Sequence, residues 1–580
     1  MKKTVDRHHP KKFRWLLNRT AVSSLLLLSS TVLAQSNAPA DLVFIGKHII
    51  TMEGPEPRRQ RKAQALAVTG EHISWMGTAE QAAQHIGPET EVIELKRRAL
   101  LPGFIDAHGH VTFQAFTISL ANVASPPVGP VTDIASLLAT LVNYMDENNP
   151  EPGSWIVGNG YDDSLLKESR HPTRQDLDQV SGDHPLALMH VSGHLVAANS
   201  KALQLAGISA DSDDPEGGHI RRIDGSNEPN GVLEETAANI LRPFMFAGQT
   251  NPLESLQQAL ALYASHGTTT VQDGATGQEV IPLIKAAADA GILTQDLIYY
   301  PVVQDATPIP AEWQVGEYQN RAKAGGVKMV LDGSPQGKTA FLSAPYHVPP
   351  DGKDASYRGY PIHPAERVTA MVKHYINAGV PILAHANGDA AADMLIDAVA
   401  AAEHQKDHRT VMIHAQTVRE DQLDDMAELK IIPSFFSAHT FFWGDWHRDS
   451  VLGPERGARI SPTRSAMDRN IPFTVHNDAP IVPPDMTRLL WASSNRKTRS
   501  GKTLGKEQRL RTYEALLAVT RNAAHQAFEE DRKGTLAVGK LADLVVLSRN
   551  PLTTAPRRLL ALEVEGTWSH GRQIYSNTPE

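Results

Sequence analysis

The chain has 580 residues, with 56 Lys and Arg against 65 Asp and Glu, and it contains no Cys. A formal net charge of −9 at pH 7 argues against a nucleic-acid-binding protein, which would present a basic face. Because Cys is absent, disulfides and thiolate ligands are excluded, and any bound metal must be held by His, carboxylate or modified Lys.

The first 34 residues predict an export signal. A basic N-terminal stretch precedes an apolar segment of residues 21–33, and Val32-Leu33-Ala34 offers small residues at a cleavage position. We therefore expect a signal peptide over 1–34, whose removal leaves a periplasmic or secreted chain without stable membrane insertion. The alternative is a membrane anchor, but the apolar segment is shorter than the roughly 20 residues that a spanning helix needs.

Short strand-like runs at both ends of the chain predict a small β domain. They are separated by Gly-containing turns and cover 41–45, 48–52, 65–69, 72–76, 91–94, 533–547 and 566–574. Neither end has enough apolar surface to stand alone, so we expect residues 35–99 and 531–580 to pair into one composite β domain. Two independent flaps are the alternative.

Residues 100–530 alternate strand-like runs with helical patterns, which is typical of βα units and a parallel sheet. Eight strand candidates predict an α/β fold with a TIM-like (β/α)8 barrel. The long gap after the first strand predicts an α/β insertion over about 113–241, above the mouth of the barrel. The predicted strands are 100–108, 268–273, 296–303, 327–332, 380–385, 410–414, 431–436 and 471–478.

Metal-capable side chains stand on these strands or at their ends. His108 and His110 close the first strand, and alternate residues of a strand share a face, so these two imidazoles are placed to hold one ion. The carboxyl ends of barrel strands converge on one face. Burying such groups without a partner is costly, and a metal removes that cost. The metal-capable groups on these strands are His108, His110, Lys328, Asp332, His385, His414 and Asp478, and we therefore expect a metal centre there.

Several motifs in this order resemble amidohydrolase family 3 of the amidohydrolase superfamily, the branch that includes N-substituted formamide deformylases. The resemblance runs from about Asp41 to Leu547. Its motifs are Gly103-Phe-Ile-Asp-Ala-His-Gly-His110, Gly160-Tyr-Asp-Asp163, His194 with Asn199, Lys328 with Asp332, His385-Ala-Asn-Gly-Asp389, His414-Ala-Gln416, Asn477-Asp-Ala-Pro480 and Gly539-Lys-Leu-Ala-Asp-Leu544.

The resemblance implies a role for each ligand. His108 and His110 would bind the more buried ion together with Asp478. His385 and His414 would bind a second ion. The expected cofactor is a divalent metal, zinc first, as one or two ions. Lys328 resembles the lysine that becomes N6-carboxylysine in such barrels and bridges two ions. A salt bridge between Lys328 and Asp332 or another acid is the alternative.

The reaction that the resemblance implies is hydrolysis of a C–N bond in an amide, N-formyl, carbamate or cyclic amide. A metal-bound hydroxide would attack the carbonyl carbon. Asp478 is the expected catalytic residue and would carry the proton to the leaving nitrogen; a turn role before Pro480 is its alternative. Two other functions stay open: an esterase or lactonase that uses the same site, and a periplasmic binding or scaffold protein with a vestigial site.

Four further residues are candidates for contact with a small-molecule substrate. Tyr161, Asp163 and His194 lie in the insertion, with a plain polar loop as their alternative. His476 stands where relatives often have Gly and shares a strand face with Asp478, so it would bind substrate or orient that carboxylate; a structural role is as open. The aromatic residues after the seventh strand, between 435 and 446, could form an apolar wall. The substrate, the number of ions and a homodimer all stay open.

Overall fold

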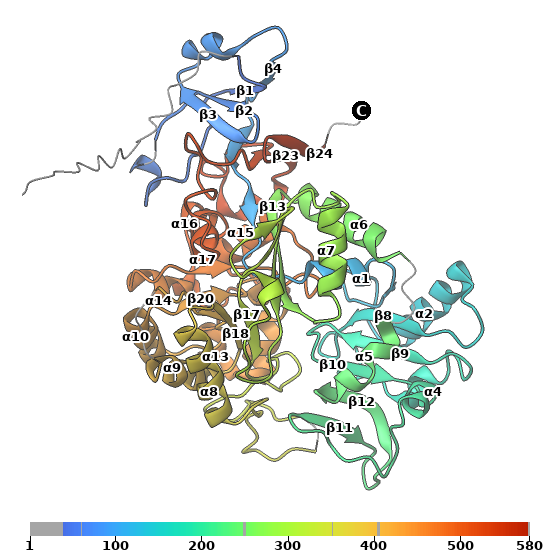
Figure 1. The fold of residues 1–580 in the computed structure, drawn as a ribbon. Coiled ribbons are helices and arrows are strands. Elements are labelled where there is room, and N and C mark those ends of the chain that lie inside the picture. The colour runs from blue at the N-terminus through green and yellow to red at the C-terminus, as the bar shows by residue number, and fades with distance from the viewer. Residues whose placement is uncertain (1–38, 60, 247–250, 351, 403–406, 578–580) are drawn as a thin grey trace, which may run out of the picture. The chain divides into compact units, whose positions relative to one another are not determined.

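The computed structural model describes residues 39–577 except 60, 247–250, 351 and 403–406. The predicted signal peptide over 1–34 lies outside the described residues. No helix within the described ranges is long and apolar enough to cross a membrane. Figure 1 traces the elements in chain order.

Two sheets, in which every strand except β15 runs parallel to its neighbours, build the body of the protein (Figure 1). The first sheet contains β6 (Phe104–Ile105), β13 (Thr268–Thr276) and β14 (Asp296–Pro301), with β16 (Ala322–Ala324) and β15 (Tyr318–Gln319) at its edge. The second contains β17 (Val327–Val330), β18 (Ile382–Ala386), β19 (Val411–His414), β20 (Ile432–Phe435) and β21 (Thr474–Val475).

Backbone hydrogen bonds connect the two sheets at two places. After β14, the Val303 N–H donates to the Lys328 carbonyl on β17 at 2.9 Å. After β6 and β21, the Asp478 N–H donates to the His108 carbonyl at 3.2 Å, and the His110 N–H donates to the Ala479 carbonyl at 2.8 Å. The arrangement is TIM-barrel-like, and each predicted strand range overlaps an observed strand.

Amphipathic helices pack against these strands. In α8 (Ala365–Asn377), for example, the residues buried against the core are Val368, Met371, Val372 and Tyr375, which recur at helical spacing. The other helices of this body are α1 (Val111–Thr117), α6 (Pro252–Ser265), α7 (Ile281–Asp289), α9 (Asp389–Ala400), α10 (Glu420–Leu429), α11 (His439–Phe442), α12 (Gly444–Trp446), α13 (Gly453–Ala458), α14 (Thr463–Asp468), α15 (Met486–Asn495), α16 (Thr512–Ala518) and α17 (Arg521–Gln526).

The first predicted strand is divided in two, which corrects the sequence analysis. β5 (Ala99–Pro102) pairs antiparallel with β22 (Leu544–Leu547), whereas β6 pairs parallel with β13. Gly103 lies between them, and a Cβ at this position would stand 2.3 Å from Thr269 Cγ2. Only glycine permits this close approach. The chain has already left β6 at His108, so strand alternation does not bring His108 and His110 together.

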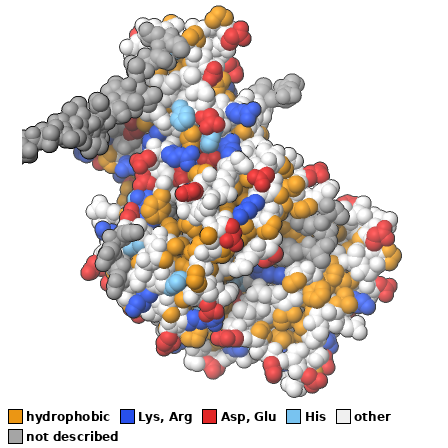
Figure 2. All heavy atoms as spheres, viewed as in Figure 1, with side chains coloured by type: hydrophobic (Ala, Val, Ile, Leu, Met, Phe, Trp, Pro, Cys, Tyr) orange, Lys and Arg blue, Asp and Glu red, His pale blue; other side chains and the backbone are white. Residues whose placement is uncertain are grey.

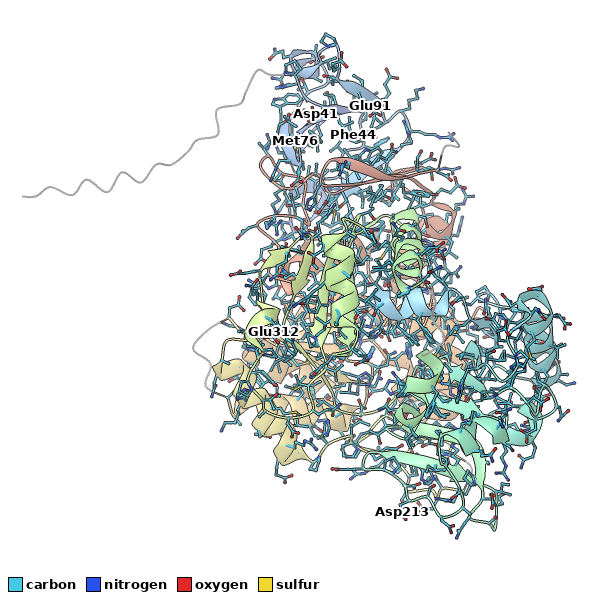
Figure 3. The ribbon with its side chains drawn as sticks, turned by 45° about the vertical axis from the view of Figure 1, so that its right-hand side comes forward. Asp41, Phe44, Met76, Glu91, Asp213 and Glu312 are labelled. Carbon is cyan, nitrogen blue, oxygen red and sulfur yellow. The ribbon has the colours of Figure 1, made fainter. Side chains whose placement is uncertain are left out.

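Strands from both ends of the chain form two small sheets that share a core. One has the order β3-β2-β1-β4 and the other β24-β23-β22-β5. Phe44 packs edge-on against Trp568 with ring centroids 5.1 Å apart; Figure 3 labels Phe44 and Met76. The Ile73 N–H donates to Lys540 at 2.9 Å. The strands not yet bounded are β1 (Leu42–Ile45), β2 (Ala65–Thr69), β3 (His72–Gly77), β4 (Glu91–Glu94), β23 (Val564–Ser569) and β24 (Arg572–Ser576).

The segment between β6 and β13 contains a six-stranded sheet of order β11-β12-β10-β9-β8-β7. A hydrogen bond of 2.6 Å from Trp443 Nε1 to Asp162 Oδ2 ties this segment to the loop after β20. Its elements are β7 (Ala121–Asn122), α2 (Ile134–Asn148), β8 (Ile156–Tyr161), α3 (Arg174–Leu177), β9 (Leu186–His190), β10 (Leu195–Ala198), α4 (Ser200–Leu205), β11 (Gly218–Arg222), β12 (Pro229–Glu235) and α5 (Arg242–Phe246).

The visible face carries acidic and basic side chains interspersed with apolar ones (Figure 2). No basic stripe appears on that face, which agrees with the acidic net charge of the sequence.

Candidate metal centre

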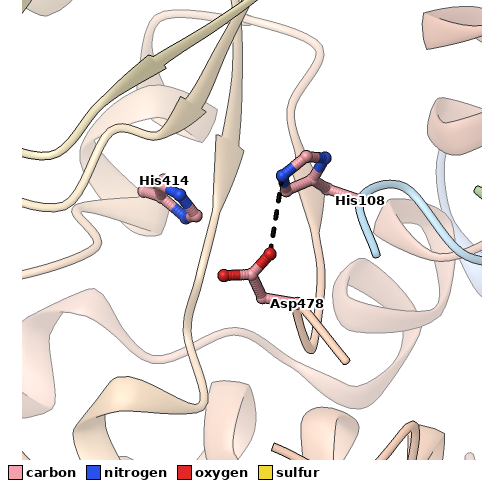
Figure 4. A group of neighbouring side chains, drawn as sticks. All are labelled: His108, His414 and Asp478. Atoms are coloured by element: carbon pink, nitrogen blue, oxygen red, sulfur yellow. Dashed lines mark ion pairs between the residues drawn. The ribbon is translucent and has the colours of Figure 1, made fainter. Parts of the chain in front are cut away.

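The structure brings the predicted ligands together at the carboxyl ends of the barrel strands. His108 Nε2 and His110 Nε2 lie 3.5 and 3.1 Å from Asp478 Oδ1. Ligand atoms of His108, His414 and Asp478 lie within 4.8 Å of one another. Figure 4 shows these three side chains facing a common space.

The remaining two ligands complete the group. His414 Nε2 lies 3.1 Å from His385 Nδ1, and Lys328 Nζ lies 3.2 Å from His108 Nε2. All of these side chains are buried except His110, whose side chain is 18% exposed. His110 therefore marks the solvent-facing side of the group.

A left-handed backbone conformation orients the side chains of His414 and Asp478. On β19 the side chains of Val411 and Ile413 pack together in one apolar cluster, whereas Met412 packs in the larger outer core. Strand alternation would place His414 on the side of Met412. Instead, φ is 71° at His414 and 58° at Asp478. Such conformations are uncommon for residues other than Gly, although His and Asp adopt them more readily than most, and here they bring both side chains into the group.

Hydrogen bonds fix the ring nitrogens that face the centre. His108 Nδ1 lies 2.9 Å from Gln272 Oε1, an oxygen that only accepts, so Nδ1 carries the proton and the Nε2 lone pair faces Asp478. His385 Nε2 donates to the Gly333 carbonyl at 3.0 Å, which leaves Nδ1 facing His414. Gly274 makes room for the first ring, because a Cβ there would stand 2.3 Å from His108 Cε1.

Burial and charge hold these groups in metal-binding protonation states. Burial lowers the pKa of His108, His385 and His414 well below the ordinary value, and nearby cationic groups lower it further. Burial also lowers the pKa of Lys328 to about 7, against the opposing effect of Asp478. For Asp478, burial alone would raise the pKa, but the hydrogen bond and charge of His110 outweigh it and the pKa falls. The centre thus offers imidazole lone pairs and one carboxylate.

The donor set fits a divalent ion. Two ligands that bind one tetrahedral zinc at 2.0–2.1 Å stand about 3.3 Å apart. The 3.1 Å between His385 Nδ1 and His414 Nε2 is close to that spacing. Imidazole and carboxylate donors suit zinc and related divalent metals.

Asp332 does not pair with Lys328. Its carboxylate accepts hydrogen bonds from the backbone N–H groups of Phe341, Asn387 and Gly388 at 2.8–2.9 Å. Burial raises the pKa of Asp332 to about 7. The carboxylate therefore holds the loops beside the centre in place. Among the described residues, Lys328 Nζ has a hydrogen bond only with His108.

Of the predicted substrate contacts, His194 lies beside the ligands. Its ring centroid is 5.0 Å from that of His385, and its side chain is 18% exposed. His194 Nδ1 lies 2.7 Å from Glu235 Oε2. Burial lowers the pKa of His194, but Glu235 outweighs it and the pKa rises.

The other predicted contacts have different neighbours. Tyr161 is fully buried, with its hydroxyl 3.2 Å from His171 Nδ1, and Asp163 Oδ1 lies 3.0 Å from His190 Nε2. The insertion thus pairs these two residues with its own histidines. His476 is also fully buried, between His414 and Ser434, so it presents no surface to a substrate. Its hydrogen-bond partners are His414 and Ser434, while Asp478 acts on it through charge.

Sequence reasoning missed the residues that support the ligands. Glu235 is a polar residue at the end of β12, and Gln272 is a polar residue in the middle of the buried strand β13; these positions are the signals that could have found them. Glu235 is buried at 7% exposure with φ of 51°, and its Oε1 has no partner among the described residues.

Comparison with known proteins agrees with this geometry. The model of the amidohydrolase family matches residues 91–575. The chain belongs to the amidohydrolase family, and it is a metal-dependent hydrolase.

Two relatives resemble it over nearly their whole length. The N-substituted formamide deformylase of Arthrobacter pascens is 27% identical, over 93% of this chain and 99% of the relative. The putative amidohydrolase YtcJ of Bacillus subtilis (strain 168) is 26% identical, over 89% of this chain and 97% of the relative. An uncharacterized metal-dependent hydrolase from Pyrococcus horikoshii OT3 shares the fold, with a TM-score of 0.68 at 22% identity over 89% of this chain and 99% of that one.

Proposed function

We propose that the protein hydrolyses a C–N bond in an amide, N-formyl, carbamate or cyclic amide substrate. The observation that carries this proposal is the convergence of His108, His110, His385, His414 and Asp478 on one buried space. Similarity to a deformylase and to a putative amidohydrolase supports the choice of bond. A divalent ion held by these residues, zinc first, would activate water and polarise the carbonyl.

Asp478 is the residue that we assign to proton transfer. Its Oδ1 faces the two histidines, and its Oδ2 has no hydrogen bond among the described residues. Because its pKa is below the ordinary value, the carboxylate is ionised at neutral pH and accepts a proton from water. It would then deliver that proton to the leaving nitrogen.

Lys328 is proposed to be N6-carboxylated. Its pKa of about 7 leaves a large neutral fraction at neutral pH, and only the neutral amine attacks carbon dioxide. The new bond joins Nζ to the carbon, and one proton is released. The resulting carbamate would supply the centre with a second anionic ligand. The Lys328→Ala variant should lose its bound metal ions and its activity. Short carboxylic acids should restore part of the metal binding and part of the activity.

For its location, we propose export and removal of residues 1–34, with a small molecule as substrate. N-terminal sequencing of the periplasmic or secreted protein should begin at Gln35. A homodimer is a proposal that sedimentation of the purified chain would test.

The test of function uses metal analysis and paired substrates. We expect the purified protein to bind zinc or manganese and to cleave an amide faster than an ester of the same shape. Asp478→Asn should abolish turnover. Faster cleavage of the ester would favour an esterase or lactonase. A protein without bound ions, and without activity after zinc or manganese is added, would refute the proposal and favour a binding or scaffold protein.

A further inference from the structure

Both ring nitrogens of His414 face other imidazoles. Nε2 lies 3.1 Å from His385 Nδ1, and Nδ1 lies 3.2 Å from His476 Nε2. His476 Nδ1 in turn lies 2.9 Å from Ser434 Oγ. Ser434 and His476 are fully buried. A chain of polar groups therefore runs from Ser434 on β20 to the metal ligands.

The positions of the protons along this chain follow from its end at His385. His385 Nε2 donates to a carbonyl, so its Nδ1 has a lone pair directed at His414. For His414 Nε2 also to offer a lone pair to an ion, the proton of a neutral His414 ring must be on Nδ1. That N–H then donates to His476 Nε2, and the His476 Nδ1–H donates to Ser434 Oγ.

The acceptor for His414 is unusual for a metal ligand. The second nitrogen of a ligating histidine normally donates to a carboxylate, a carbonyl or water. Among the described residues, no carboxylate forms a hydrogen bond or an ion pair with His414, whereas Asp478 contacts both His108 and His110. His476 is therefore the group that can fix the ring of His414 and the nitrogen that faces the centre.

We propose that His476, held by Ser434, is a positioning residue that orients His414 as a metal ligand. This inference rests on the proposed function, because it requires that His414 bind an ion. It differs from the predicted role of His476 in substrate binding, since the residue acts through His414 and never touches the substrate.

The test measures ion binding without turnover. His476→Leu replaces the imidazole with an apolar side chain of similar size and so removes the hydrogen-bond acceptor. It should weaken binding of the ion at His385 and His414 by about 10- to 100-fold. His476→Gln supplies an amide oxygen that accepts the His414 Nδ1–H, and it should restore most of the affinity. Ser434→Ala should give a smaller loss and covers the case in which His476→Leu fails to fold. Equilibrium dialysis with Co²⁺ and the visible absorption of bound Co²⁺ report affinity and ligand geometry.

A matched control separates this role from a structural one. His447 is also fully buried and bonds to an imidazole, His439, at 2.9 Å, but it contacts no ligand. His447→Leu should leave Co²⁺ affinity and the spectrum unchanged. Equal affinities in wild type, His476→Leu and Ser434→Ala would overturn the positioning role and leave the proposed function intact. A wild-type protein that binds no Co²⁺ would overturn both.

Discussion

Lys533 is expected to be a strong determinant of stability, because it is a buried cation surrounded by acids. Its side chain is fully buried, and Nζ forms an ion pair with Asp296 at the start of β14. Glu529 and Asp543 lie 3.8 and 3.9 Å away, and Thr270 Oγ1 lies 3.1 Å away. Burial lowers the pKa of Lys533, but these three acids outweigh it and the pKa rises.

The magnitude follows from what each substitution leaves behind. Removing one partner of a buried ion pair typically costs about 3–5 kcal/mol. In Lys533→Met, the carboxylate of Asp296 keeps contacts of 3.2 Å with Arg321 and His570, so we expect the lower limit, about 3 kcal/mol. Asp296→Asn should cost a similar amount. The double variant leaves no opposed charge at this pair and should lose clearly less than the sum of the two.

Urea unfolding followed by circular dichroism and tryptophan fluorescence measures these effects. Arg469→Met is the control, because Arg469 pairs at 2.9 and 2.7 Å with Glu420 and Asp424, whose side chains are 47% and 67% exposed. Such exposed pairs contribute less than about 1 kcal/mol. If Lys533→Met unfolds at the wild-type urea concentration, or if the two single effects simply add, the reasoning about buried charge is wrong.

Three further predictions concern the histidines. Gln272→Leu removes the acceptor for His108 Nδ1 and should weaken zinc binding about 10- to 100-fold in a chelator competition; unchanged affinity would contradict the assigned ring orientation. Gly274→Ala should also weaken zinc binding in that assay because its Cβ would meet the His108 ring, whereas Gly182→Ala, with nothing within 4 Å, should not. Burial lowers the pKa of His447 from 6.5 to about 3, so the unfolded chain binds more protons between these values. Stability should therefore fall as the pH drops from 6.5 toward 3, by at most about 1.4 kcal/mol per pH unit from this residue, and urea midpoints for wild type and His447→Leu that shift equally with pH would refute it.

The strands, and the side chains that meet at their carboxyl ends, could be predicted because their signals are local. An apolar run that ends in His or Asp, as at His385 and Asp478, marks both a strand and the group that it presents. The division of the run at Gly103 was missed, because both halves are apolar and their residue types do not indicate which strand each half pairs with. The turn at His414 depends on a backbone conformation that residue types do not encode.

Pairs of buried polar side chains escaped prediction for another reason. Tyr161 and Asp163 were candidates for contact with the substrate, and the structure pairs them with His171 and His190, which lie within the same insertion. Such contacts between buried polar groups have no periodicity and no fixed spacing in the sequence. The contact of His476 with Ser434, 42 positions away, is of the same kind.

The break at Gly103 limits how the gene can be divided. Leu100 and Leu101 pair with Val546 and Val545. The strand that leads toward His108 and His110 therefore needs a partner strand from the C-terminal part of the chain. A shortened version that ends before 531 would expose the unpaired edge of β5 to solvent and to other chains. A shortened protein that is meant to keep the site must therefore retain residues from Asp41 to Ser576. Tags or fused proteins belong before or after this range.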